Sequence, residues 1–174
     1  MPLPVSGWRK WTGSNGKSTD HIFKDLLSRL QKETLKTKGF KKSGNNFRLI
    51  LSDGTSKLIN FQKSAFNSDG ECRFTINIGL YFQQDTANPN LRFKEYECQI
   101  RTRVSGISKR YSGDHWWVIT EVTDAEKLYA ELHQLMMEDI LPWLDQFESR
   151  RAVIQVGQTG ALRGMIWGSI YVNV

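Results

Sequence analysis

Residues that could carry catalysis are few and widely spaced in this sequence. The histidines are His21, His115 and His133, and none is spaced with a Cys, Asp or Glu as a metal site or an activated nucleophile requires. Neither the GxSxG nor the HExxH motif occurs. These absences favour a protein that is not an enzyme, and we expect no catalytic residue, no metal ligand and no cofactor.

Two short stretches imitate motifs of enzymes. Asp69, Glu71 and Lys63 supply the acidic pair and the lysine of a metal-dependent nuclease, although the solubility of a turn explains the two acids better. Residues 13–18, GSNGKS, are similar to a phosphate-binding loop, but that motif requires a glycine where the chain has Trp11. A small hydrolase or nuclease is therefore the second alternative for the function.

Residues 58–82 predict a hairpin of two strands with one apolar and one polar face. Apolar and polar residues alternate in both arms, and residues 67–70, Asn-Ser-Asp-Gly, have turn-forming chemistry. Because successive strand side chains point to opposite faces, helices on the apolar face would leave the polar face open. Together with a predicted strand at residues 96–104, the polar face would present Asn60, Gln62, Ser64, Thr75, Asn77, Tyr81, Gln99, Arg101 and Arg103.

This polar face has two interpretations. A half-solvated antiparallel sheet normally has such a face, and Gln62 and Asn77 then make hydrogen bonds that are only structural. Alternatively, the amides and hydroxyls converge on a ligand, and Arg101 and Arg103 bind a carboxylate or a phosphate. The candidate binding residues are Asn60, Gln62, Ser64, Asn77, Gln99, Arg101 and Arg103, together with Lys41 and Lys42.

Charge is distributed unevenly along the chain, whose net charge is +6. Residues 1–64 carry thirteen Lys and Arg against four Asp and Glu, whereas residues 114–149 carry one against nine. The acidic part either folds against the basic part or leaves a polyanion-binding end. Nucleic-acid binding is therefore the first alternative, with phosphate contacts and stacking platforms from Lys38, Lys41, Lys42, Arg48, Arg101, Arg103, Lys109, Arg110, Phe40, Phe47 and Tyr111.

The elements that must position these residues form an α+β domain. Apolar periodicity predicts a helix over residues 19–38 and strands at residues 46–51 and 115–120. A second helix opens at a capping box, residues 123–126, and is kinked or restarted at Pro142. We expect an antiparallel sheet of about five strands, one face of which packs on the N-terminal helix and on this long Pro-kinked C-terminal helix.

A chain of 174 residues favours one domain over two. We expect that domain to occupy residues 19–149. A loose basic tail, residues 1–18, would precede it. A C-terminal extension, residues 150–174, would follow it and would add a strand at residues 165–172.

The two cysteines and the first residues bear on the cellular compartment. Cys72 and Cys98 each lie in a predicted strand and away from any CxxC motif, so two buried thiols are expected, with a disulfide between them left open. The chain shows neither a secretory signal nor an apolar run that could span a bilayer. We expect a cytoplasmic protein with no membrane partner.

Six short motifs follow one another in a distinctive order: GFKK (39–42), INFQKS (59–64), FTINIG (74–79), CQIR (98–101), WW (116–117) and LPWL (141–144). In that order they resemble a bacterial family of uncharacterised domains, the domain of unknown function family four-three-zero-four, over residues 20–149. The resemblance implies a small bacterial α+β domain and brings no catalytic residue with it. Small uncharacterised domains of this kind are similar to immunity proteins, which bind and block a partner toxin.

The expected function is accordingly that of a non-enzymatic bacterial binding protein. Its partner is expected to be a protein, such as a toxin that it neutralises. The oligomeric state is left open.

Overall fold

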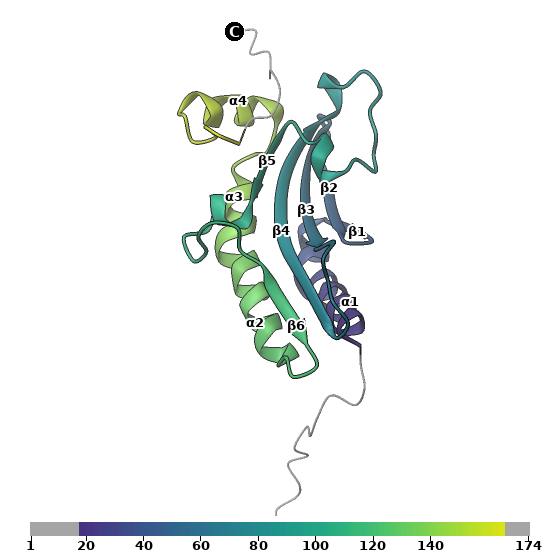
Figure 1. Ribbon diagram of the computed structural model, residues 1–174. Coiled ribbons are helices and arrows are strands. Elements are labelled where there is room, and N and C mark those ends of the chain that lie inside the picture. Colours follow the sequence, from purple (N-terminus) through teal and green to yellow (C-terminus); the bar gives the residue numbers. More distant parts are fainter. Residues whose placement is uncertain (1–17, 166–174) are drawn as a thin grey trace, which may run out of the picture.

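An antiparallel sheet with helices against one face makes up the part of the chain that the structure, a computed structural model, describes: residues 18–165 (Figure 1). The α-helices are α1 (Thr19–Leu30), α2 (Ala125–Leu135), α3 (Leu141–Asp145) and α4 (Arg150–Gln158). π-helical turns follow α1 and α2, at Gln31–Leu35 and Met136–Ile140, and short 3₁₀ turns lie at Lys36–Lys38, Gln83–Asp85, Glu95–Glu97 and Val104–Gly106. The strands are β1 (Lys41–Ser43), β2 (Asn46–Ile50), β3 (Thr55–Lys63), β4 (Glu71–Phe82), β5 (Ile100–Arg103) and β6 (Trp117–Thr120).

The long strand β4 organises the sheet. The strand order is β1-β2-β3-β4-β5, and β6 also pairs with β4. β6 pairs with residues 71–74 at the beginning of β4, and β5 pairs with residues 77–80 farther along it. The predicted hairpin of residues 58–82 is confirmed as β3 and β4, and the predicted α+β class with an antiparallel sheet is confirmed as well. The short strand β1, which alternation did not indicate, brings the number of strands within residues 18–165 to six.

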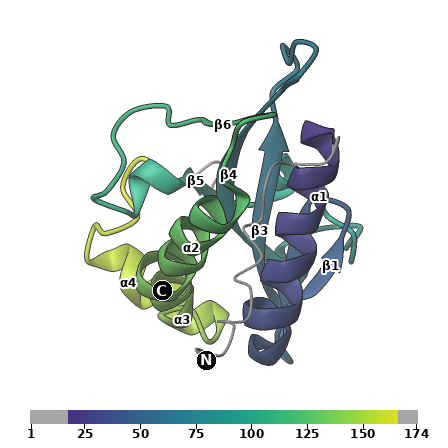
Figure 2. The ribbon, with the colours of Figure 1, turned by 90° about the horizontal axis from the view of Figure 1, so that it is seen from below.

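α1 and α2 lie side by side against the apolar face of the sheet (Figure 2). The apolar stripe of α1 is buried there, and the Phe23 ring lies 5.2 Å from the Phe74 ring of β4, centroid to centroid. The helix predicted over residues 19–38 is confirmed as α1 and the two turns that follow it. It ends at Gly39, whose φ of 86° is left-handed and is tolerated because glycine has no Cβ.

The second helix begins one residue later than the capping-box spacing predicted. Asp124, rather than Thr123, is the N-cap: its side chain accepts hydrogen bonds from the backbone N–H groups of Glu126 and Lys127 at 3.1 and 3.0 Å. Thr123 instead accepts from the N–H of Thr120 at 2.8 Å. The predicted interruption at Pro142 is confirmed, because a π-helical turn ends α2 and Pro142 lies at the start of α3.

Residues 83–99, the covering segment, fold over one end of the other face of the sheet. Leu58 and Tyr81 on this face are buried with Phe93 and Cys98 of the covering segment in a small second core. The Tyr81 and Phe93 rings stack with centroids 4.3 Å apart. The prediction that Tyr81 lies on a solvated face is therefore wrong, because a loop without apolar periodicity supplies partners for it.

The strand predicted at residues 96–104 is shorter than expected. Glu95–Glu97 form a 3₁₀ turn, and β5 begins only at Ile100. Cys98 therefore belongs to the second core, and Ile100 is buried in the main core on the opposite face. Cys72 also lies in the main core, and both thiols are free, so the disulfide that the sequence left open does not form.

The predicted basic tail and C-terminal extension are described only in part, at Ser18 and at residues 150–165. The described part of the basic tail is Ser18, the N-cap of α1, whose hydroxyl accepts from the N–H of His21. At the other end, residues 150–158 form α4. Of the strand predicted at residues 165–172, the structure describes Met165, which lies in a turn and accepts a hydrogen bond from the N–H of Arg101.

Candidate binding grooves on the open sheet face

Four amide side chains form a hydrogen-bonded chain across β2, β3 and β4, here called the amide chain. Asn46, Asn60 and Asn77 face one another in the strand register. The Asn77 side chain donates to Asn60 Oδ1 at 3.1 Å and to Gln62 Oε1 at 2.8 Å, and Asn60 Nδ2 donates to Asn46 Oδ1 at 2.8 Å. Asn77 is only 3% exposed, so it anchors the amide chain from the interior of the domain.

The amide chain has a direction that determines what its ends can bind. Asn77 uses its amide nitrogen for both of its bonds, and Asn60 accepts one bond and donates the next. Within the described residues, the oxygens of Asn46 and Gln62 are therefore acceptors, and their NH₂ groups stay available as donors. These two ends favour a ligand rich in hydrogen-bond acceptors.

The amide chain forms part of the floor of an open groove of about 890 Å³, here called the amide groove. One wall is the turn between β1 and β2, and the other is formed by residues 90–96 of the covering segment. Arg92 and Lys94 on the second wall are exposed and form no ion pair with a described residue. Tyr96, on the same wall, is 70% exposed. The groove therefore combines amide donors, unpaired cations and an accessible aromatic ring.

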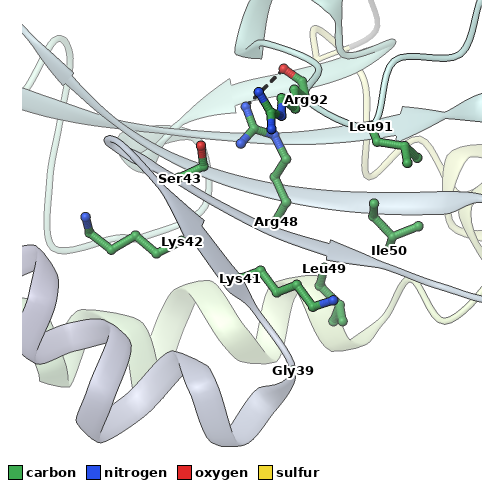
Figure 3. A pocket seen from close by; sticks show the side chains of 9 residues that line it. All are labelled: Gly39, Lys41, Lys42, Ser43, Arg48, Leu49, Ile50, Leu91 and Arg92. Atoms are coloured by element: carbon green, nitrogen blue, oxygen red, sulfur yellow. Dashed lines mark hydrogen bonds between the residues drawn. The ribbon is translucent and has the colours of Figure 1, made fainter.

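A second, smaller groove of about 380 Å³ lies at the sheet edge beside β1, here called the edge groove (Figure 3). Ile50 and Leu91 line it and are 42% and 61% exposed. Ser43, Arg48 and Arg92 line both grooves, so the two adjoin.

Arg48 lies at the junction of the two grooves and holds the covering segment in place. It is 8% exposed, and its guanidinium donates to the carbonyl of Phe93 at 2.9 and 2.6 Å and to that of Arg92 at 3.3 Å. Burial lowers the pKa of Arg48, yet a guanidinium keeps its charge at neutral pH. Among the described residues no carboxylate forms an ion pair with it, so its charge adds to the positive potential of both grooves.

The structure brings five of the candidate binding residues to these grooves. Asn60 and Gln62 line the amide groove, and Asn77 supports both from below. Lys41 and Lys42 are exposed on β1 and line the edge groove.

The other four candidates have contacts within the domain. Gln99 accepts from the N–H of Phe82 at 2.9 Å and donates to Thr86 at 3.2 Å, which closes the covering segment at its base. Ser64 accepts from the N–H of Phe66 in the β3–β4 turn. Arg101 pairs with Glu95 at 3.2 Å, and Arg103 pairs with Asp114 and lies 5.4 Å from the Trp116 ring centre.

Several residues proposed for nucleic-acid contacts are engaged elsewhere. Phe40 and Phe47 are buried in the main core and provide no stacking surface, contrary to the expectation. Arg110 pairs with Glu138 and, at 3.0 Å, with Asp139 of the acidic helical region. Arg29 of the basic part also pairs with Glu126 of the acidic part at 2.8 Å, so the acidic part folds against part of the basic region, which is one of the two arrangements that the charge pattern left open.

The histidines and acids do not gather into a reactive group. His21 lies beside Asp25 on the outer face of α1, and His133 Nδ1 lies 2.9 Å from the Thr34 hydroxyl. His115 lies just before β6, apart from these two histidines in the sequence, and burial lowers the pKa of its imidazole. Within residues 18–165, no set of three or more His, Cys, Asp or Glu side chains could hold a metal ion, and no helix is long and apolar enough to span a membrane.

Sequence reasoning missed two parts of the site. The first could have been predicted from alternation, and the second could not. Asn46 begins the predicted strand 46–51, and alternation with buried Phe47 would have placed it on the polar face. Arg92, Lys94 and Tyr96 lie in a segment without periodicity, and no pattern indicates which strand such a segment covers.

Comparison with protein families identifies the region that contains both grooves. Residues 31–146 match the model of a family described as Domain of unknown function (DUF4304). The chain belongs to this family. The DUF4304 region contains the six strands that the structure describes and every residue named here as lining a groove, whereas α1 and α4 lie outside it. Comparison with curated proteins gave no match, and comparison with solved structures gave none either.

Proposed function

We propose that this DUF4304 domain is a non-enzymatic binding protein whose amide groove takes an acidic segment of a protein partner. The observation that carries the proposal is the amide chain, which leaves two NH₂ donors at the groove. Carboxylates and backbone carbonyls are the protein groups that accept from such donors. The nearby charges of Arg92 and Lys94 favour the carboxylates, because charge-assisted hydrogen bonds are about twice as strong as neutral ones.

A protein partner agrees better with these groups than a nucleic acid does. The rim mixes two unpaired cations with an exposed tyrosine, and Tyr and Arg are the side chains that most often dominate protein interfaces. Two of the expected stacking residues are buried, and Arg101, Arg103 and Arg110 are neutralised by carboxylates. A toxin in a bacterial cytoplasm, blocked by binding, is the partner that we favour, because small domains of this kind are similar to immunity proteins.

The test is retention of a partner from a lysate of the source cell by the immobilised chain, with and without nuclease. Three forms are compared: wild type, the double variant Arg92→Glu and Lys94→Glu, and the control Lys127→Glu, whose exposed lysine lies on α2. We expect one protein at equal stoichiometry that survives nuclease. The purified partner should bind the double variant at least tenfold more weakly and should bind the control as it binds wild type.

Arg92 and Lys94 are chosen in preference to Arg101 and Arg103. A glutamate at position 101 would face Glu95, so a loss of binding there would not distinguish contact from misfolding. Equal binding by wild type and the double variant would refute the amide groove as the site. Retention of nucleic acid alone, with an affinity that falls steeply as salt rises, would replace the protein partner with a polyanion.

A further inference from the structure

We infer that the amide groove and the edge groove form one continuous site for an extended segment of the partner, with an aliphatic side chain of that segment between Ile50 and Leu91. This inference rests on the proposed function and names the chemistry of the segment. It also predicts how far apart the aliphatic and acidic residues of the segment lie.

Continuity of the two grooves follows from strand geometry. Asn46, Arg48 and Ile50 are alternate residues of β2, so their side chains share one face. Asn46 lines the amide groove, Ile50 lines the edge groove, and Arg48 lines both. The joined site therefore follows the five residues of β2, a span of four steps or about 13 Å at roughly 3.3 Å per residue.

The edge of the sheet leaves room for such a segment. Lys41, the first residue of β1, pairs with Arg48, so no described strand lies beside Ile50 on that side. Ile50 and Leu91 lie next to each other at one end of the edge groove, and the Lys41 side chain extends nearby (Figure 3). Their partly exposed surfaces are positioned to cover one aliphatic side chain.

Charge restricts what can occupy the site. Lysines on a short edge strand are a device that proteins use against unwanted strand pairing. Lys41 pairs with Arg48 in the register and so shares the face of the joined site, where its charge repels a basic segment and attracts an acidic one. The occupant is therefore an acidic extended segment with an aliphatic anchor.

Spacing follows from the same geometry. In an extended segment, side chains at positions i, i+2 and i+4 point the same way and match the two-residue period of β2. An aliphatic residue over Ile50 then places an acidic residue near the donors of Asn46 when the two are four positions apart. The order is free, because the segment can run along β2 in either direction.

The experiment is selection of displayed random twelve-residue peptides on the full chain. Wild type is compared with Leu91→Ser and with the control Val122→Ser, which alters a 92% exposed side chain far along the chain from either groove. Selected peptides should be rich in Asp and Glu, with Leu, Ile or Val four positions from an acid. A peptide selected on wild type should bind Leu91→Ser about tenfold more weakly, as expected for an aliphatic contact, and should bind the control unchanged.

The outcomes separate this inference from the function on which it rests. Acidic peptides without an aliphatic residue at fixed spacing, or an aliphatic preference that persists in Leu91→Ser, would overturn the inference and leave the acid-binding amide groove in place. Selection of no acidic peptides would overturn both. Leu91 is 61% exposed, so its replacement by serine should leave the fold intact, and an unchanged unfolding midpoint verifies this.

Discussion

Replacing Gly79 by alanine tests whether the covering segment packs against β4, the position in which it forms a wall of the amide groove. A Cβ at this position of β4 would lie 2.6 Å from Cys98 Sγ and 2.9 Å from Cys98 Cβ, both closer than atoms can pack. Gly79 has an ordinary φ, so alanine introduces no backbone strain. The cost of Gly79→Ala therefore comes from Cys98 alone.

The magnitude follows from two opposing terms. Overpacking costs about 1–3 kcal/mol, and the smaller entropy of the unfolded chain returns about 0.4–1 kcal/mol. We expect Gly79→Ala to lower the free energy of unfolding by about 1–2 kcal/mol, or the midpoint temperature by roughly 2–8 °C for a chain of this size. In a Cys98→Gly background the clash is absent, so the same substitution should be neutral or stabilising.

The assay is urea and thermal unfolding of the four proteins of this double-mutant cycle. Gly157→Ala is the control, because its Cβ would meet Leu162 at an ordinary 3.8 Å within helix α4. It should stabilise by about 0.5–1 kcal/mol. If Gly79→Ala has the same effect with and without Cys98, the covering segment does not pack against β4, and the groove wall formed by residues 90–96 is misplaced.

Two further predictions concern the amide chain and the basic side of α1. Asn77→Ala should lower the free energy of unfolding by about 1–3 kcal/mol because it leaves Asn60 Oδ1 without its donor, whereas exposed Gln62→Ala should change it by less than about 0.5 kcal/mol; equal effects in urea unfolding would contradict an anchoring role for Asn77. Hydrogen bonds from Lys24, and then Lys63, lower the pKa of Asp20 to about 2 from its ordinary 3.8, so the stability that the Asp20 carboxylate contributes is fully present above pH 3.8 and is lost as the pH falls through about 2. Because the Asp20 side chain is 46% exposed, Asp20→Asn should cost less than about 1 kcal/mol at pH 7, and a difference from wild type that is as large at pH 2 as at pH 7 would contradict this assignment.

The parts of the fold that could be predicted are those whose residues repeat with a clear period. The helix of residues 19–38 and the hairpin of residues 58–82 both have long, regular apolar patterns, and both are present. The predicted strand at residues 96–104 failed in its first half, because alternating residues there form a 3₁₀ turn. Short alternation alone does not distinguish a strand from a turn that packs on a sheet.

The sequence predicted which strand residues belong to the candidate site. It did not predict how their side chains pair or where the far wall of the groove lies. Alternation placed Asn60, Gln62 and Asn77 on one face, which the structure bears out in their mutual hydrogen bonds. Which of them pair depends on the strand register, and a shift of two residues would have placed Asn60 opposite Thr75 without changing either face. The far wall lies in a polar loop whose position is fixed by the Arg48 guanidinium and by Cys98, contacts that no local pattern indicates.

The attachment of the covering segment to the sheet determines how the binding specificity of the two grooves can change during evolution. Gln99 closes its base by bonding Phe82 and Thr86, Arg48 holds the carbonyl of Phe93, and Cys98 lies against Gly79, so these side-chain attachments flank residues 87–92. Residues 87–92 are all exposed, and their hydrogen bonds to the sheet use backbone groups: the Asn90 N–H donates to the Tyr81 hydroxyl, and the Arg92 carbonyl accepts from Arg48. Substitutions and insertions in this stretch would reshape the rims of both grooves while leaving the fold intact. The domain thus separates a scaffold that must be preserved from a surface that is free to evolve toward new partners.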